Sequence, residues 1–527
     1  MNPDSSDNNQ NYESQYTIGQ HNIQKLGFDV HKPVFTISAL LILSFVFITL
    51  FNPELANQSL SASKAWCIEH FDWFFMGAAN FFLLFCLVLT VGPVGKIRLG
   101  GDGATTDFTT RSWLAMLFAA GVGIGLMFWG VAEPVAYYSN WFGTPLSVSP
   151  NTPEAAQLAI TASVFHWGVH GWAFFIIVAV ALAFFHYNKG LPLTIRSVFY
   201  PIIGDRCWGW PGHIIDISAV VATLFGLATS LGLGATQASS GLNYLFNAPD
   251  GLITQILVIV TISAITVISV KRGLQGGIKL LSNINMFFAF LLLCFVFLVG
   301  PSVLLLESFF NNIVDYAINI IPLSNWHDRS DESWMHAWTV FYWAWWVSWS
   351  PFVGMFIARI SRGRTIRELT IAALFVPTMV VMLWFTVFGN TALFQAQQNI
   401  GELSNGISSV SLAMFQMLEN LPFNIISSGV GILLLLIFFI TSSDSGALVL
   451  DTITAGGKLE TPIPQRIFWA LLQGLIACAL LYGGGAMALN ALQAATITAA
   501  LPFTAILLIM CLSLYKGLRE YSFTNAK

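Results

Sequence analysis

Apolar stretches of about 20 residues recur along the whole chain, and this pattern restricts the possible folds more than any other feature. A helix of that length crosses a hydrocarbon core of ~30 Å. Hydrophobic residues make up 56% of the 527 residues and charged residues only 9%, whereas a soluble domain carries about 25% charged residues. Because so few charges cannot cover a water-exposed surface, the sequence predicts an all-α integral membrane protein.

The apolar stretches predict twelve membrane spans. They lie near 34–52, 72–92, 112–138, 158–185, 214–242, 252–270, 282–305, 336–358, 368–394, 426–450, 467–484 and 489–515. Residues 1–33 then form a polar N-terminal tail, residues 34–515 one twelve-helix domain, and residues 516–527 a short C-terminal tail. The N-terminal tail has no apolar segment of the kind found in signal peptides, so the first span is expected to start insertion.

The basic residues predict the orientation of these spans. If both tails and alternate loops lie on one side, that side holds 20 of the 22 Lys and Arg residues, and only Lys64 and Arg329 lie on the other. The positive-inside rule then places both termini in the cytoplasm. No Lys or Arg is left at mid-membrane, where a charge costs at least ~2.5 kcal/mol, and no basic run indicates nucleic-acid binding.

Two predicted spans contain helix-breaking residues. The third carries three glycines at alternate positions, Gly121, Gly123 and Gly125, and Glu133-Pro134 is expected to end it. The eighth is expected to break at Pro351. These spans are five apart, so they occupy matching places if spans 3–7 and 8–12 are two five-helix repeats. Matched broken helices point to a ligand site at the midplane of a secondary transporter, although Gly and Pro can also serve helix packing alone.

The eighth span also carries a cluster of aromatic residues. Its members Tyr342, Trp345, Trp346 and Trp349 are spaced to share one helical face, while Trp343 lies to the side. Span four adds Trp167, Trp172 and Phe175. A ring face attracts a cation by ~0.5–2 kcal/mol and requires no hydrogen-bond donor from it. The cluster therefore predicts a box for a methylated ammonium group; the alternative is core packing or an interfacial belt at the span ends.

Span ten brings a dense set of side-chain oxygens, from Thr441 to Ser445, to membrane depth. Hydroxyl groups and the free carbonyls of a broken helix are suitable ligands for a partly dehydrated sodium ion. The segment therefore predicts a sodium site. The alternative is a hydroxyl-mediated helix contact, with Asp444 at the aqueous boundary.

Other functional classes find less support in the sequence. His166 and His170 lie one turn apart but lack a third ligand at suitable spacing, so helix–helix hydrogen bonding is expected there rather than metal binding. No nucleophile–base pair indicates an enzyme, and no cofactor besides a coupling ion is expected. Neither a repeated pore loop nor a charged ring indicates a channel.

Four segments, in this order, are similar to those of a known family: GVGIGLMFWGVAEP, FHWGVHGW, YWAWWVSWSPFVGMFIARISRGRTIRE and TSSDSGALVL. Over nearly its entire length the chain resembles the betaine/choline/carnitine transporter family. The resemblance implies a leucine-transporter-like fold, in which inverted repeats of spans 3–7 and 8–12 follow two extra helices. It also implies alternating access, a multi-pass location in the bacterial cytoplasmic (inner) membrane, and a homotrimer.

Carried over by position, the resemblance implies two sets of site residues. The substrate is expected to contact Trp167, Trp172, Phe175, Trp345, Trp346, Trp349, Gly121, Gly123 and Gly125. Trp346 is expected closest to the ammonium head, and Phe175 replaces a tyrosine of the family's sodium-coupled betaine importer. The principal sodium site is expected to use the backbone of Ala119, Val122 and Phe438 and the side chains of Thr441 and Ser442.

Some positions depart from that importer. Its second sodium site uses two threonines; Thr223 matches the first, but Leu227 occupies the second, so one sodium ion is expected. Gly125 stands where proton-coupled choline importers tend to carry an aspartate, which favours betaine and sodium, whereas Leu227 is more typical of the choline importers.

We therefore expect a sodium-coupled symporter for a small quaternary-ammonium solute, above all glycine betaine. The alternatives are a proton-coupled or voltage-driven choline importer and a carrier of carnitine or dimethylsulfoniopropionate. Osmotically activated members of the family resemble this chain but bear a long charged C-terminal tail. Since residues 516–527 are short, we expect transport that changes little with osmolality.

Overall fold

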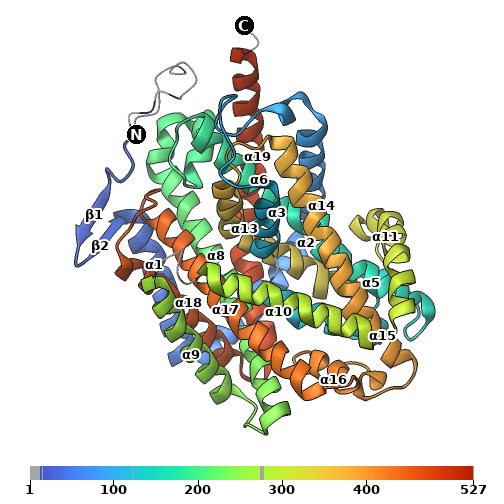
Figure 1. Cartoon of the computed structure of the whole chain (residues 1–527). Coiled ribbons are helices and arrows are strands. Elements are labelled where there is room, and N and C mark those ends of the chain that lie inside the picture. Colours follow the sequence, from blue (N-terminus) through green and yellow to red (C-terminus); the bar gives the residue numbers. More distant parts are fainter. Residues whose placement is uncertain (1–11, 13, 15, 122, 273–277, 526–527) are drawn as a thin grey trace.

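The computed structural model describes residues 12, 14, 16–121, 123–272 and 278–525. Figure 1 shows the helices gathered into one bundle, with a small β-hairpin at its edge beside α1. The hairpin pairs β1 (Asn22–Lys25) with β2 (Phe28–His31) in antiparallel register and is the only sheet within the described residues; one isolated bridge pairs Arg98 with Thr365.

Helices lie at each of the predicted spans. In chain order these are α1 (Lys32–Phe51), α2 (Pro53–Val91), α3 (Thr110–Gly121) with α4 (Ile124–Tyr138), α5 (Pro153–Trp167) with α6 (Val169–Ala183), α8 (Trp210–Phe246), α9 (Leu252–Arg272), α10 (Ile278–Val299), α13 (Val340–Ile360), α14 (Ile366–Trp384) with α15 (Asn390–Gln397), α17 (Asn424–Thr454), α18 (Ile463–Gly484) and α19 (Ala488–Asn525).

The other helical elements are connections or additions. They are α7 (Tyr200–Ile203), α11 (Ser302–Ser324), α12 (Glu332–Trp334) and α16 (Ala413–Glu419), the π-helical turns η3 (Phe184–Asn188), η6 (Met335–Thr339) and η7 (Phe385–Gly389), and the 3-10 turns η1 (Pro93–Lys96), η2 (Pro145–Ser147), η4 (Arg196–Phe199), η5 (Gly204–Trp208), η8 (Glu402–Asn405) and η9 (Gly485–Met487).

Nine helical stretches of the described chain are long and apolar enough to cross a membrane. They cover ten of the predicted spans, because the stretch Ile463–Phe523 holds both α18 and α19. The two missing spans are the third, which is divided into two shorter helices, and the eighth, whose many indole rings are less apolar than aliphatic side chains. The all-α membrane fold is confirmed, and the count of twelve crossings stays a prediction.

The expected breaks are only partly right. The third span does divide at Gly123, between α3 and α4, but α4 continues through Pro134 to Tyr138. The predicted break at Pro351 is wrong, since α13 runs through this residue. Proline frees the carbonyl four residues back, and the hydroxyl of Ser350 donates to that carbonyl, on Val347, at 2.8 Å.

The fourth span divides at Gly168, which the sequence analysis did not predict. Gly168 has φ −92° and ψ −142° between α5 and α6. A Cβ at this position would lie 2.6 Å from the carbonyl oxygen of Val164 and 2.7 Å from the hydroxyl of Tyr316. Glycine is needed here because the last turn of α5 and the Tyr316 hydroxyl of α11 approach its backbone closely.

Two segments assigned to loops or tails have more structure than predicted. Helix α11 fills the predicted loop after span seven, and its buried residues Leu305, Asn312, Tyr316 and Leu323 form one stripe at helical spacing. The predicted C-terminal boundary at 515 does not end the helix, because α19 continues to Asn525. Its last turns are held by packing: Leu518 and Tyr521 are buried.

The two ends of the described chain meet. The hydroxyl of Tyr12 donates to Oε2 of Glu520 at 2.8 Å. This contact places both ends on the same side of the bundle, as an even number of spans requires.

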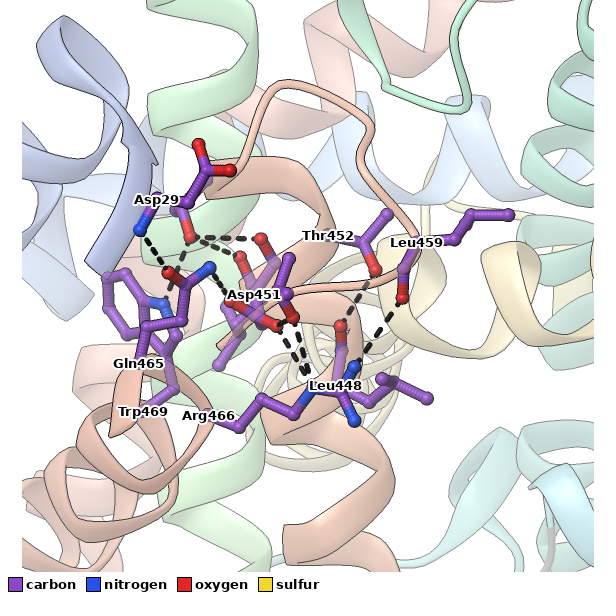
Figure 2. Close-up of polar contacts among 11 residues, drawn as sticks. Asp29, Leu448, Asp451, Thr452, Leu459, Gln465, Arg466 and Trp469 are labelled. Carbon is purple, nitrogen blue, oxygen red and sulfur yellow. Dashed lines mark hydrogen bonds and ion pairs between the residues drawn. The ribbon is translucent and has the colours of Figure 1, made fainter. Parts of the chain in front are cut away.

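A polar network ties the hairpin to the connection between α17 and α18 (Figure 2). Asp451 accepts hydrogen bonds from Thr461 and Gln465, and Nε of Arg466 lies 3.2 Å from its Oδ2. Gln465 in turn accepts from the backbone N–H of Asp29 at 2.7 Å. The Asp451 carboxylate is fully covered and therefore needs these partners.

We predict that Asp451→Asn lowers the thermal stability of the protein far more than Asp29→Asn. The first change leaves Arg466 without its carboxylate in a largely buried site, which typically costs about 3–5 kcal/mol. Asp29 pairs with Lys458 at a partly exposed site, where an ion pair is worth ~1 kcal/mol or less. Thermal unfolding of the purified variants, followed by tryptophan fluorescence, measures both. Equal shifts of the two midpoints would contradict this ranking.

Candidate functional site

Four aromatic rings from three helices pack together at the centre of the bundle. The rings of Trp345 and Trp346 on α13 are nearly parallel, with centroids 5.7 Å apart. Trp167, the last residue of α5, stands edge-on to Trp346 at 4.9 Å, and Phe175 of α6 does so at 5.6 Å. All four side chains are buried. The structure thus brings these predicted residues into one cluster, which we call the aromatic box.

The indole N–H groups of the box are directed at protein acceptors. Trp346 donates to the carbonyl of His166 at 2.8 Å, and Trp345 donates to the hydroxyl of Ser230 at 3.3 Å. Trp167 donates to Oε2 of Glu133 at 2.9 Å. Since the polar edges are occupied, these rings have only their faces left for a ligand. Ring faces attract cations.

Two further predicted tryptophans lie at the border of the box. Trp172 contacts Phe175 edge-on at 5.5 Å. Trp349 points toward α8, where its N–H donates to the carbonyl of Gly226 at 3.1 Å. Trp343 faces away from the box, as the helical spacing predicted, and its N–H lies 3.2 Å from the sulfur of Met76 on α2.

The start of α4 lies directly against the box. A Cβ at Gly125 would lie 2.2 Å from Cη2 of Trp167 and 3.2 Å from Cη2 of Trp345. In the described part of the chain, no side chain caps the N-terminus of α4, where Gly123 is the N-cap residue. The first N–H groups of a helix carry partial positive charge and bind anions. The box and this helix terminus together present a place for a cation and a place for an anion.

A carboxylate that the sequence analysis assigned only to a helix end holds the box in position. Glu133 of α4 is completely buried and accepts from four side chains. The hydroxyl of Tyr137 and Nδ1 of His166 lie 2.7 and 2.8 Å from Oε1, and Oε2 accepts from the hydroxyl of Tyr342 at 2.5 Å and from Trp167. Its position inside a predicted span could have indicated that Glu133 is important, because intramembrane carboxylates are rare and usually functional.

An aromatic lining continues from the box to a cavity of about 350 Å³. Trp129, Trp141 and Trp338 line this cavity together with Lys64. The ring of Trp129 lies 6.3 Å from that of Tyr342, which contacts Trp167 at 5.6 Å. The cavity lies on the Lys64 side of the molecule, and Trp129 and Tyr342 separate it from the box.

The predicted sodium residues lie beside the break in the third span. A Cβ at Gly123 would lie 3.8 Å from the hydroxyl of Ser442 and 3.9 Å from the ring of Phe438, both on α17. Thr441 donates to the carbonyls of Ile437 and Phe438 at 3.0 and 3.1 Å. Its oxygen lone pairs can still accept from or coordinate another group.

The remaining sodium residues are described less fully. The backbone of Ala119 belongs to α3, as does Gly121, and Val122 lies outside the described residues. Leu227 stands where the family's sodium-coupled importer has a threonine of its second sodium site. It packs on Gly446, and a Cβ at Gly446 would lie 2.5 Å from Cδ1 of Leu227. The hydroxyl of Thr223 is buried and has no hydrogen-bond partner among the described residues.

The two histidines of span four make hydrogen bonds between helices, as predicted. His166 lies 2.8 Å from Glu133 and 3.0 Å from the hydroxyl of Thr339, and Nε2 of His170 lies 3.2 Å from the amide oxygen of Asn80. Asp444, which the alternative interpretation of span ten put at the aqueous boundary, is 5% exposed and accepts from Ser269 of α9.

Comparison with known proteins finds relatives that are all named as transporters. A model of the betaine/carnitine/choline family of transporters matches residues 33–523. Glycine betaine transporter 1 of Vibrio parahaemolyticus is 58% identical, with 96% of this chain and 97% of that protein covered. The glycine betaine/proline/choline/ectoine transporter of the same bacterium is 56% identical, with 96% and 90% covered. The glycine betaine transporter OpuD of Bacillus subtilis is 42% identical, with 89% and 91% covered.

We predict opposite effects on stability for the same substitution at two glycines. Gly125→Ala forces a methyl group into the ring of Trp167, and such overpacking typically costs about 1–3 kcal/mol. Gly77→Ala in α2 places its Cβ in open space and should stabilise the helix by roughly 0.5–1 kcal/mol. Thermal unfolding of the purified variants measures both. A stabilised Gly125→Ala variant would show that the box does not lie against α4.

Proposed function

Since this chain belongs to the betaine/carnitine/choline family of transporters, we propose that it imports a small quaternary-ammonium solute, above all glycine betaine, across the bacterial inner membrane. The observation that carries the proposal is the contact between the aromatic box and the uncapped start of α4 at Gly125.

The box suits the cationic end of such a solute. A trimethylammonium group has no N–H to donate, so it cannot form N–H hydrogen bonds to acceptor side chains. The faces of Trp167, Trp345 and Trp346 attract it through the ring quadrupole, at ~0.5–2 kcal/mol for each ring. Phe175 supplies a further apolar wall and, unlike a tyrosine, brings no hydroxyl to it.

The start of α4 suits the other end of a zwitterion. Glycine betaine carries a carboxylate, and the helix terminus beside the box offers N–H groups with partial positive charge. Choline carries a neutral hydroxyl in place of the carboxylate and gains less from this terminus. The arrangement therefore supports betaine above choline, which remains the alternative substrate because the name of one relative includes both.

We further propose that one sodium ion drives the uptake. Ser442 and Phe438 lie next to the broken span at Gly123, and Thr441 contributes a hydroxyl from the same helix. A single charge moving through 100 mV contributes about 2.3 kcal/mol, which corresponds to roughly forty-fold accumulation. Coupling to one sodium ion would make the uptake of a zwitterion electrogenic. A cytoplasmic location of both termini, a homotrimer, and inverted repeats of spans 3–7 and 8–12 complete the proposal.

The first prediction compares two neighbouring tryptophans. Trp346→Ala should strongly reduce betaine affinity or abolish uptake, because it removes the ring that contacts both Trp167 and Phe175. Trp343→Ala should be milder, because that ring packs toward α2. Uptake kinetics at equal surface expression test the difference. Equal impairment of both variants would contradict the assignment of faces.

The second prediction concerns coupling. Thr441→Ala and Ser442→Ala should raise the sodium concentration for half-maximal uptake, because each removes a hydroxyl ligand. Thr452→Ala is the matched control: its hydroxyl also donates to the carbonyl four residues back on α17, away from the break. Sodium titrations of uptake in proteoliposomes provide the measurement. Wild-type uptake that does not depend on the sodium concentration but is abolished by a protonophore would contradict sodium coupling and favour proton coupling.

A further inference from the structure

Three metal-ligating side chains converge away from the aromatic box. Nε2 of His336 lies 3.0 Å from Oδ2 of Asp72 and 3.8 Å from Oε1 of Glu332. All three ligand atoms lie within 4.8 Å of one another. We propose that Asp72, Glu332 and His336 form a binding site for a divalent transition-metal ion, Zn²⁺ in the first place, that bridges α2 to the start of α13.

The spacing of the ligands suits Zn²⁺. Bonds of about 2.0–2.2 Å to nitrogen and oxygen place the ligand atoms of a tetrahedral ion roughly 3.4 Å apart. The His336–Asp72 and His336–Glu332 distances lie on either side of this value. Small side-chain rotations would therefore bring these ligand atoms to the spacing that a tetrahedral Zn²⁺ requires. Three protein ligands leave a fourth position for water, as in open zinc sites.

Two of the ligands are already fixed relative to each other. Glu332 of α12 and His336 of η6 are four residues apart on one continuous helical run that leads into α13, so they share a face. His336 lies in a π-helical turn, a distortion that is frequent at functional sites. The chain thus presents a preformed pair of ligands to α2.

The third ligand is oriented by its own backbone. Oδ1 of Asp72 accepts from the N–H of Trp73 at 2.5 Å, which leaves Oδ2 directed at His336. Such outer contacts fix a ligating carboxylate and strengthen metal sites. The side chains of Asp72 and His336 are 19% and 26% exposed and that of Glu332 is 67% exposed, so an ion can enter from solvent.

The nearest charged neighbours do not compete for the ion. Arg329 pairs with Asp331 at 2.7 Å, and both side chains are buried in this pair. Oδ2 of Asp331 also accepts from the backbone N–H of Leu146 at 2.6 Å. This carboxylate is thus held by Arg329 and by the backbone of Leu146, which leaves Asp72 and Glu332 as the carboxylates that face His336.

A metal at this site would connect a helix of the box to its neighbour. Helix α13 carries Trp345 and Trp346, and its Trp343 already contacts Met76 one turn after Asp72 on α2. Alternating access requires bundles of helices to move against each other. Zn²⁺ is therefore expected to restrict movement between α2 and α13 and to slow uptake.

Calorimetric titration of purified, tag-free protein with Zn²⁺ tests the site without reference to transport. We expect saturable binding of one ion, weakened at least about tenfold by Glu332→Gln or His336→Gln. Glu332 is mostly exposed, so its variant keeps the fold even if the His336 variant does not. His327→Gln is the matched control, because His327 lies 3.3 Å from Asp328 in a fully accessible pair without a third ligand in the described chain. It should leave binding unchanged.

Wild-type protein that binds no Zn²⁺, or variants that all bind like the wild type, would overturn the proposal. Mg²⁺ should not compete, because it prefers six oxygen ligands. Uptake into cells with external Zn²⁺ tests the bridge: the wild type should slow several-fold and Glu332→Gln should not. Uptake that is unaffected at saturating Zn²⁺ would refute the bridge. This result would leave the substrate proposal unaffected, because that proposal is tested by uptake measurements without added metal.

Discussion

The arrangement at the centre of this protein depends on one buried carboxylate. Glu133 lies inside a helix bundle that is surrounded by lipid, where an uncompensated charge costs several kcal/mol. It is compensated by donors from α4, α5 and α13, among them Trp167 and Tyr342. Because these bonds must all form together, they fix the ring of Trp167 against Trp345 and Trp346. Tyr137 and His166 complete the set, and His166 also offers its carbonyl to Trp346.

This constraint explains why the box offers ring faces rather than ring edges. Each indole N–H of Trp167, Trp345 and Trp346 already has an acceptor within the protein. A ligand with strong hydrogen-bond donors would find few acceptors left, while a methylated cation requires none. The helix terminus at Gly125 is a source of positive potential for a carboxylate beside the box. The specificity proposed here thus follows from which polar groups are already occupied.

The sequence predicted best those features that are set by residues close together in the chain. Apolar length predicted the helices, and helical spacing predicted that Trp343 points away from the face that carries Trp345 and Trp346. It failed at Pro351, where the hydroxyl of the adjacent Ser350 satisfies the freed carbonyl of Val347, and at Gly168, where a distant group, the Tyr316 hydroxyl of α11, approaches the backbone. The partners of Glu133 and the Asp72–His336 pair are also long-range contacts, with sequence separations of up to 264 residues. No local pattern reveals such pairs.

The break at Gly123 connects the two proposed sites physically. On one side Gly123 faces Ser442 and Phe438 of α17, and two residues later Gly125 faces Trp167 and Trp345. An ion that orders this segment from the α17 side also orders the start of α4, where the solute's carboxylate is expected. By thermodynamic linkage, bound solute must then raise the affinity for the ion by the same factor as the bound ion raises the affinity for the solute. Coupling of this kind needs no chain of intermediate residues, because Gly123 at the break and Gly125 in the first turn of α4 lie only two residues apart. The glycines leave room for both ligands to approach the same backbone.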